Sequence, residues 1–309
     1  MFNEGFCLVS ESGNHLVVQK LLGRGGRRDV YEVLISETGE RKALRWFREG
    51  DVNFDHKVHE NLAFLSRIGC PDKSILWVED VASTGDAGFG YVTRLIPNGF
   101  VPFYKLVRER ELSEVSKCNF ALDYLRALHN ANTQGLLLFT ADGEANCYVH
   151  AQTGHLLIDE CERTTIRGST LYPMMYVHKY AAPEVILGKN ELDIYTNRFS
   201  MAVVLFFVFF YGHPLEGKQT TAPCLTSSII RKVYGEYPLF IFDQDDTSNR
   251  PTPIVHSKVI SSWDAAPDYV KNIFIKAFSQ EALHNPKARP NEKEFAQVIY
   301  RYKAEITMQ

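Results

Sequence analysis

Cysteine is sparse in this sequence and shows no pairing pattern. The six cysteines lie far apart and form no Cys-x-x-Cys pair. This spacing argues against a disulfide framework and a cysteine zinc site, and it favours reduced thiols. The ten histidines include no His-Glu-x-x-His pattern, so the zinc-hydrolase motif is also missing.

An excess of basic charge is missing as well. The formal net charge is −3 and the pI is near 6.4, so neither a nucleic acid nor an anionic membrane is expected as a partner. The first residues contain neither the basic nor the apolar region of a signal peptide, which predicts a cytoplasmic protein.

Long hydrophobic runs are also absent. The most apolar run, residues 201–212, is shorter than the roughly 20 residues that a membrane-spanning helix needs. We therefore predict a buried core helix there.

The composition that remains is that of a globular protein. Hydrophobic residues make up 45% and charged residues 23% of the 309 residues, enough for one large core or two modest lobes. No internal repeat, low-complexity tract or long linker separates domains, so any lobes belong to one fold.

The first part of the chain has the pattern of a β-sheet with one helix. β-like runs separated by turn residues occur at residues 15–23, 29–36, 41–47, 75–81 and 89–96. Residues 54–69 carry Val58, Leu62 and Leu65 at helical spacing and stop at Gly69 before Pro71. We predict a five-stranded antiparallel sheet with one inserted helix.

From residue 103 the pattern becomes helical. Residues 112–131 have a wide apolar face, and residues 227–235, 268–278 and 291–302 repeat the helical period. The sequence thus predicts an α+β protein with a small β-rich lobe, residues 1–98, and a larger, mainly helical lobe, residues 99–309.

A glycine-rich turn and two later segments point to one family. Gly23, Gly25 and Gly26 lie in a strand-turn-strand context, where backbone N–H groups can cover phosphates or a plain hairpin can form. Residues 182–184 read Ala-Pro-Glu, and residues 197–218 and 285–295 follow as an apolar helix and an Arg-Pro helix start. With these segments the chain resembles a protein kinase.

The resemblance covers essentially the whole chain. By residues 212–218, 240–253 and 272–283 it is nearest to bacterial Ser/Thr kinases encoded beside von Willebrand-type domains and phosphatases. It implies a bilobal kinase fold, with a partly buried ion pair between Glu184 and Arg289. It also implies a protein partner: another kinase, a phosphatase or a von Willebrand-type domain protein.

The catalytic loop departs from the family pattern. Asn146 precedes Asp159 by thirteen residues, the family spacing of the two groups that hold Mg²⁺. The position five residues before Asn146, where the family has its catalytic aspartate, is Ala141. An alanine methyl cannot act as a general base, and Asp142 or Glu144 is the alternative carboxylate.

The nucleotide pocket departs as well. Arg45 stands where the family has its ATP-contacting lysine, with Glu60 as its expected partner and Asp55 as an alternative. Arg28 replaces a glycine of the loop, and Arg28 or Arg27 is expected either to cover a phosphate or to block the pocket. Asn197 replaces an aspartate that braces the catalytic loop, and its carbonyl oxygen can still accept hydrogen bonds.

The hypothesis that follows is a pseudokinase, which binds partners without ordinary phosphoryl transfer. The alternatives are an active Ser/Thr kinase, an atypical ATP-dependent transferase, or a kinase silenced by substitution at Ala141. ATP with Mg²⁺ is the expected cofactor, and the residues expected to bind it are Gly23, Gly25, Gly26, Arg45, Glu60, Asn146 and Asp159.

Two segments are candidates for docking a partner, residues 163–180 and the loop at residues 218–228. The first includes exposed-looking Met174, Met175 and Tyr176. The possible phosphate acceptors in this first segment are Thr164, Thr165, Ser169 and Thr170.

Overall fold

The computed structural model describes residues 1–26, 28–48, 52–85, 88–109, 112–138, 147–159, 161–168, 177–221 and 226–308. The chain divides into two compact units, Met1–Phe100 with Leu157–Met174 and Val101–Leu156 with Met175–Gln309. The sequence predicts one boundary, after residue 98. The first unit also takes in a segment from much later in the chain.

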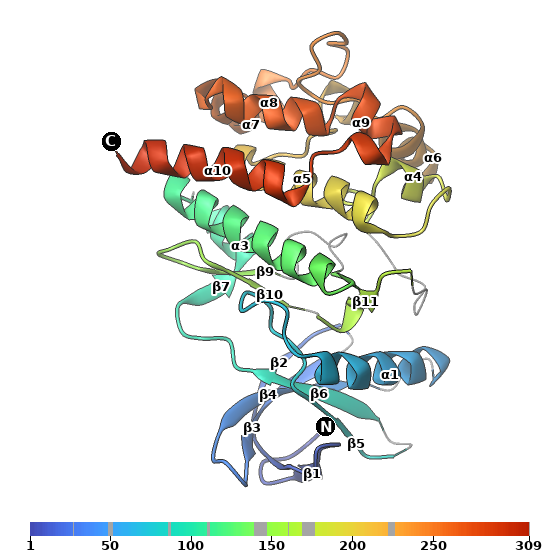
Figure 1. The fold of residues 1–309 in the computed structure, drawn as a ribbon, viewed down its shortest axis with the longest axis vertical. Helices are drawn as coiled ribbons and strands as arrows, with labels where there is room; N and C mark the ends of the chain where they lie inside the picture. The colour runs from blue at the N-terminus through green and yellow to red at the C-terminus, as the bar shows by residue number, and fades with distance from the viewer. Residues whose placement is uncertain are drawn as a thin grey trace. The chain divides into compact units, whose positions relative to one another are not determined.

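The first unit is built on a six-stranded sheet, and its neighbouring strands run antiparallel (Figure 1). In spatial order the strands are β1 (Cys7–Val9), β2 (His15–Arg24), β3 (Arg28–Ile35), β4 (Arg41–Phe47), β6 (Phe89–Arg94) and β5 (Asp80–Ser83). The prediction of five strands missed β1, because a three-residue strand with one buried side chain is too short to show a period of two.

Strand β5 also begins later than predicted. The buried residues from Ile75 onward were expected to lie in it, but Ile75 forms a parallel bridge with Ile158, and the Leu76 N–H donates to the Ile158 carbonyl oxygen at 2.9 Å. This backbone pairing therefore holds the later segment, which carries Asp159, in the first unit.

Helix α1 (Val52–Ile68) packs against β5 and β6 (Figure 1). The predicted inward residues Val58, Leu62 and Leu65 are buried. The helix is followed by Gly69, whose φ of +85° lies in the left-handed region that favours glycine.

Arg45 lies in a closely packed part of the six-stranded sheet. Arg45 on β4 is opposite Val30 of β3 and Tyr91 of β6. The neighbouring Gly90 leaves room for this arrangement, because a Cβ there would lie 2.6 Å from the Arg45 carbonyl oxygen and 2.9 Å from the Trp46 ring. The backbone around Arg45 therefore has little freedom to move.

The second unit is mainly helical, and α10 lies along α3 within it (Figure 1). The helices are α2 (Phe103–Glu109), α3 (Glu114–Thr133), α4 (Pro183–Ile186), α5 (Ile194–Phe210), α6 (Ser227–Arg231), α7 (Pro253–Ala265), α8 (Asp268–Ala277), α9 (Gln280–His284) and α10 (Glu292–Thr307). A π-helical turn spans Lys232–Glu236. The remaining short strands are β7 (Phe100–Pro102), β8 (Leu136–Leu137), β9 (Cys147–His150), β10 (Leu156–Ile158) and β11 (Thr165–Ile166).

The apolar run at residues 201–212 forms most of α5, the predicted buried helix. Asp193 caps its N-terminus by accepting hydrogen bonds from the N–H groups of Tyr195 and Thr196. Phe206 packs edge-on against Phe240 and Phe274, with ring centroids 5.7 and 5.6 Å away. None of the helices in the described part of the chain has the length and apolar character needed to cross a bilayer.

Candidate functional site

Arg45 and Asp159 form a buried ion pair in the first unit. Nη1 of Arg45 lies 2.8 Å from Oδ2 of Asp159, and the two side chains are 5% and 11% exposed. Nε of Arg45 also donates to Oγ1 of Thr93 at 3.3 Å. Burial is the largest single influence and works to lower the pKa of the Arg45 guanidinium, but the Asp159 carboxylate together with the smaller contributions of Tyr91 and Glu162 raises that pKa above its ordinary value. Arg45 is therefore permanently charged.

A second buried pair lies beside the first. Nη1 of Arg28 is 2.6 Å from Oε1 of Glu162, and the Tyr91 hydroxyl donates to Oε2 of Glu162 at 2.7 Å. Arg28 also donates to the Tyr91 hydroxyl oxygen. Burial raises the pKa of the Tyr91 hydroxyl well above its usual value, so Tyr91 remains a donor. We call the six side chains of Arg28, Arg45, Tyr91, Thr93, Asp159 and Glu162 the charge cluster.

Asn61 on α1 fixes the chain segment that supplies the two carboxylates. Its side-chain nitrogen donates to the carbonyl oxygens of Glu162, at 3.1 Å, and Thr164, at 2.8 Å. Asn61 is 1% exposed, so these bonds are shielded from water. The sequence analysis did not single out Asn61 or Glu162. A charged residue directly after a buried strand and a cysteine was the only available signal for Glu162.

The structure does not pair Arg45 with Glu60, and this expectation was wrong. Glu60 is exposed, and its Oε1 lies 3.5 Å from Nδ1 of His56. Successive residues point about 100° apart around a helix, so the register that turns Asn61 inward turns Glu60 to solvent. The side chain of the alternative partner, Asp55, lies outside the part that the structure describes.

The glycine-rich segment forms a tight hairpin between β2 and β3. The Gly25 N–H donates to the Arg28 carbonyl oxygen at 2.8 Å, and Gly23 lies in β2. The Arg48 side chain donates to the carbonyl oxygens of Gly25 and Gly26. Arg28, expected either to cover a phosphate or to block the pocket, binds Glu162 and Tyr91.

The predicted catalytic loop lies outside the described residues. This applies to Ala141, Asp142, Glu144 and Asn146. The last described residue before the loop, Leu138, accepts a 2.7 Å hydrogen bond at its carbonyl oxygen from the side-chain nitrogen of Asn197. The amide nitrogen of Asn197 thus donates at the start of this segment, while the expected hydrogen bonds to its carbonyl oxygen concern loop residues outside the described ranges. An aspartate could not make this bond when ionised.

Asp159 in this arrangement does not fit a divalent cation. Mg²⁺ needs a carboxylate oxygen that is free to coordinate it, and the Asp159 carboxylate already holds Arg45. Two unit charges about 4 Å apart interact by roughly 4 kcal/mol near a protein surface, so a dication would meet about twice that repulsion from the guanidinium, which offsets much of its attraction to the carboxylate. Among the residues described, no group of three or more His, Cys, Asp or Glu side chains is arranged to hold a metal.

The first predicted docking segment, residues 163–180, is only partly described. Thr164 and Thr165 are fully buried, so the expectation that they accept phosphate is contradicted. The other residues expected to act there, Ser169, Thr170, Met174, Met175 and Tyr176, fall outside the described ranges.

The structure brings Glu184 and Arg289 together in the second unit. Nη1 and Nη2 of Arg289 donate to the two carboxylate oxygens of Glu184, each at 2.7 Å. Nη1 also donates to the Tyr195 carbonyl oxygen at 3.0 Å, and Nε to that of Ala282 at 2.9 Å. The pair therefore ties the Ala-Pro-Glu segment to α5 and to the segment before α10.

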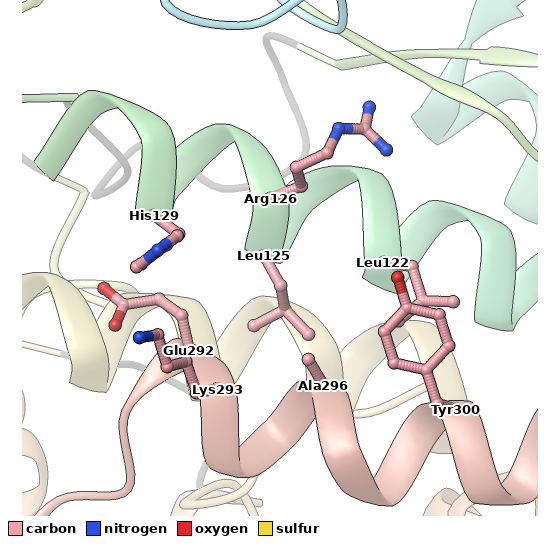
Figure 2. A pocket seen from close by; sticks show the side chains of 8 residues that line it. All are labelled: Leu122, Leu125, Arg126, His129, Glu292, Lys293, Ala296 and Tyr300. Atoms are coloured by element: carbon pink, nitrogen blue, oxygen red, sulfur yellow. The ribbon is translucent and has the colours of Figure 1, made fainter. Parts of the chain in front are cut away.

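A shallow cavity of about 100 Å³ lies between α3 and α10, also in the second unit. Figure 2 shows Leu125 pointing toward Ala296, with His129 facing Glu292 at one end. The Glu292 carboxylate accepts a hydrogen bond from Asn132 at 2.7 Å. None of the expected nucleotide-binding residues lines this cavity.

Comparisons with known proteins support the fold and no finer assignment. No protein-family model matches the chain, and no curated protein matches it. Among solved structures, the chain is similar to the twitchin kinase region from C. elegans, with a TM-score of 0.67 and 15% identity. The match covers 91% of this chain and 45% of that one. At this identity the likeness shows the fold alone, which is protein kinase-like.

Proposed function

We propose that this chain is a pseudokinase, a kinase-like scaffold or regulatory protein with impaired phosphoryl transfer. The observation that carries the proposal is the ion pair between Arg45 and Asp159. By the family resemblance, these two positions contact the nucleotide phosphates and the metal ion. Here each charged group satisfies the other, so neither is free to act on a substrate.

Ala141 supports the same proposal from the sequence. It stands where the family has the aspartate that accepts the proton of the substrate hydroxyl. A general base typically contributes about 10²- to 10⁴-fold in rate. The missing base at position 141 affects proton removal from the substrate, and the pairing of Asp159 with Arg45 affects metal binding. A variant that corrects one of these defects would therefore still have the other.

The partner proposed for this scaffold is a cytoplasmic bacterial protein: another kinase, a phosphatase or a protein with a von Willebrand-type domain. ATP remains the proposed ligand of the glycine hairpin. The second candidate function, an active or atypical ATP-dependent transferase, is favoured by the family spacing of Asn146 and Asp159.

Phosphoryl transfer from radiolabelled ATP tests the proposal. The protein is incubated with Mg²⁺ or Mn²⁺ and with general protein substrates, beside an Asp159→Ala variant. We expect equal, background incorporation in both proteins. Incorporation that depends on Asp159 would overturn the pseudokinase proposal in favour of the transferase.

A gain-of-function variant sharpens this test. The double variant Arg45→Lys with Ala141→Asp supplies two of the family residues that the chain lacks. Transfer by the double variant, with none by the natural sequence, would identify these two positions as the cause of the defect. Calorimetry with ATP, with and without Mg²⁺, reports nucleotide binding separately from transfer.

A further inference from the structure

The charges of the charge cluster balance one another. It contains two guanidinium groups, on Arg28 and Arg45, and two carboxylates, on Asp159 and Glu162. All four side chains are at most 12% exposed, so these charges have little water around them. A buried charge needs a partner, and here the protein supplies each partner itself.

The position of Arg45 relative to Asp159 is that of a bound cation. Nη1 of Arg45 lies 2.8 Å from the carboxylate, and Thr93 holds Nε from the other side. The guanidinium cannot lose its proton in the physiological range, so a change of pH does not release the carboxylate. The planar group is also held by its strand, because β4 lies between β3 and β6.

We infer that Arg45 takes the place of a divalent metal ion at Asp159, and that the site is a latent cation site occupied by the protein's own guanidinium. The inference rests on the proposed function for the identity of the site and adds why Asp159 does not hold a metal ion there. Removal of Arg45 alone should leave a buried carboxylate that attracts Mg²⁺ or Mn²⁺, whose preferred ligands are oxygen atoms.

Manganese binding by the purified full chain tests this inference without any activity assay. Free Mn²⁺ is measured by electron paramagnetic resonance, and thermal unfolding is followed with and without Mn²⁺. We expect the natural protein to show no saturable binding that depends on Asp159. Arg45→Met should bind Mn²⁺ at least about tenfold more tightly and should regain thermal stability when the ion is added.

Two further variants serve as controls. Arg45→Met with Asp159→Asn removes the carboxylate as well and should lose the response to Mn²⁺. Arg41→Met makes the same change on the same strand, at an exposed arginine that pairs with Glu32, and should behave as the natural protein does.

Saturable Mn²⁺ binding by the natural protein that Asp159→Asn abolishes would overturn the inference. A folded Arg45→Met variant that gains no Mn²⁺ affinity would also overturn it. If Arg45→Met does not fold, the inference is tested by comparing Mn²⁺ binding of the natural protein with that of Asp159→Asn. If the natural protein binds Mn²⁺ through Asp159 but transfers no phosphoryl group, this inference is contradicted and the proposed function is not.

Discussion

Arg289 holds Glu184 through two hydrogen bonds of 2.7 Å, although 105 positions separate the two residues in the chain. The Arg289 side chain is 1% exposed and that of Glu184 is 10% exposed. Such a bidentate pair is strong because both oxygens receive a donor in a fixed geometry. The pair also limits how the chain between the two residues can rearrange.

Arg289→Met is expected to destabilise the protein by about 3 to 5 kcal/mol, because it leaves the Glu184 carboxylate buried without a partner. Urea unfolding measures the effect. Arg301→Met removes an exposed pair with Glu305 and should cost less than about 1 kcal/mol. If the two variants unfold alike, the buried pair has no special structural role. Adding Glu184→Met to Arg289→Met should recover part of the loss.

Tyr91→Phe is expected to cost about 1 to 3 kcal/mol of stability, because Oε2 of Glu162 loses a buried donor. The matched control is Tyr302→Phe. The Tyr302 hydroxyl also donates to a glutamate, Glu114, at 2.9 Å, but that hydrogen bond is exposed. Thermal unfolding of the two variants should therefore differ. A loss no larger in Tyr91→Phe than in Tyr302→Phe would contradict the role of the hydroxyl in the charge cluster.

Asn61→Asp is expected to destabilise the first unit by about 2 kcal/mol or more, because a carboxylate would replace the amide donor opposite two carbonyl oxygens. The neighbouring change, Glu60→Gln, affects an exposed side chain and should change stability by less than about 0.5 kcal/mol. Chemical denaturation compares them directly. A larger effect from Glu60→Gln would restore the predicted pair of Glu60 with Arg45.

Stability is expected to fall between about pH 6.5 and pH 4 through His213. Its Nε2–H donates to the Lys179 carbonyl oxygen at 2.6 Å, and its Nδ1 accepts from the Leu215 N–H at 3.1 Å. Burial lowers the pKa of His213 to about 4. The unfolded chain takes up this proton first as the pH drops, so the contribution is complete above about pH 6.5 and lost toward pH 4.

The loss through His213 should reach about 3 kcal/mol, since each pKa unit is worth about 1.4 kcal/mol. Unfolding free energies from pH 7 to pH 4.5 measure the slope. His213→Gln should flatten it, whereas His56→Gln, at an exposed histidine, should not. Parallel slopes for the natural protein and His213→Gln would rule out this assignment.

The sequence predicts elements and buried faces well where a period repeats. Residues 41–47 were expected to form a strand and do so as β4, and the run at residues 201–212 forms most of the buried helix α5. The helical spacing of Val58, Leu62 and Leu65 placed the inner face of α1 correctly. A repeated apolar spacing predicts a helix or strand because an apolar residue is buried at each turn of a helix and at every second residue of a strand.

The partners of individual side chains were harder to predict than the helices and strands. They depend on how each helix is rotated about its axis and on how the strands pair with one another. Rotating α1 by about 100° about its axis would bring Glu60 to the inner face in place of Asn61. The apolar period does not show which of these two polar residues faces inward. The partner of Arg45 comes from another part of the chain, so spacing within α1 could not identify it. Glu162 is buried where Arg28 and Tyr91 contact it, and these contacts depend on how the sheet folds.

The first unit is assembled from two stretches of chain, and this has a consequence for its synthesis. Arg28 and Arg45 emerge from the ribosome long before Asp159 and Glu162, which complete their charge balance. Chains generally fold as they are made, domain by domain. Until residue 162 has been added, the sheet carries Arg28 and Arg45 without the two carboxylates that balance their charges. A nascent chain of about 100 residues is therefore an incomplete folding unit, because it lacks the later stretch of the first unit.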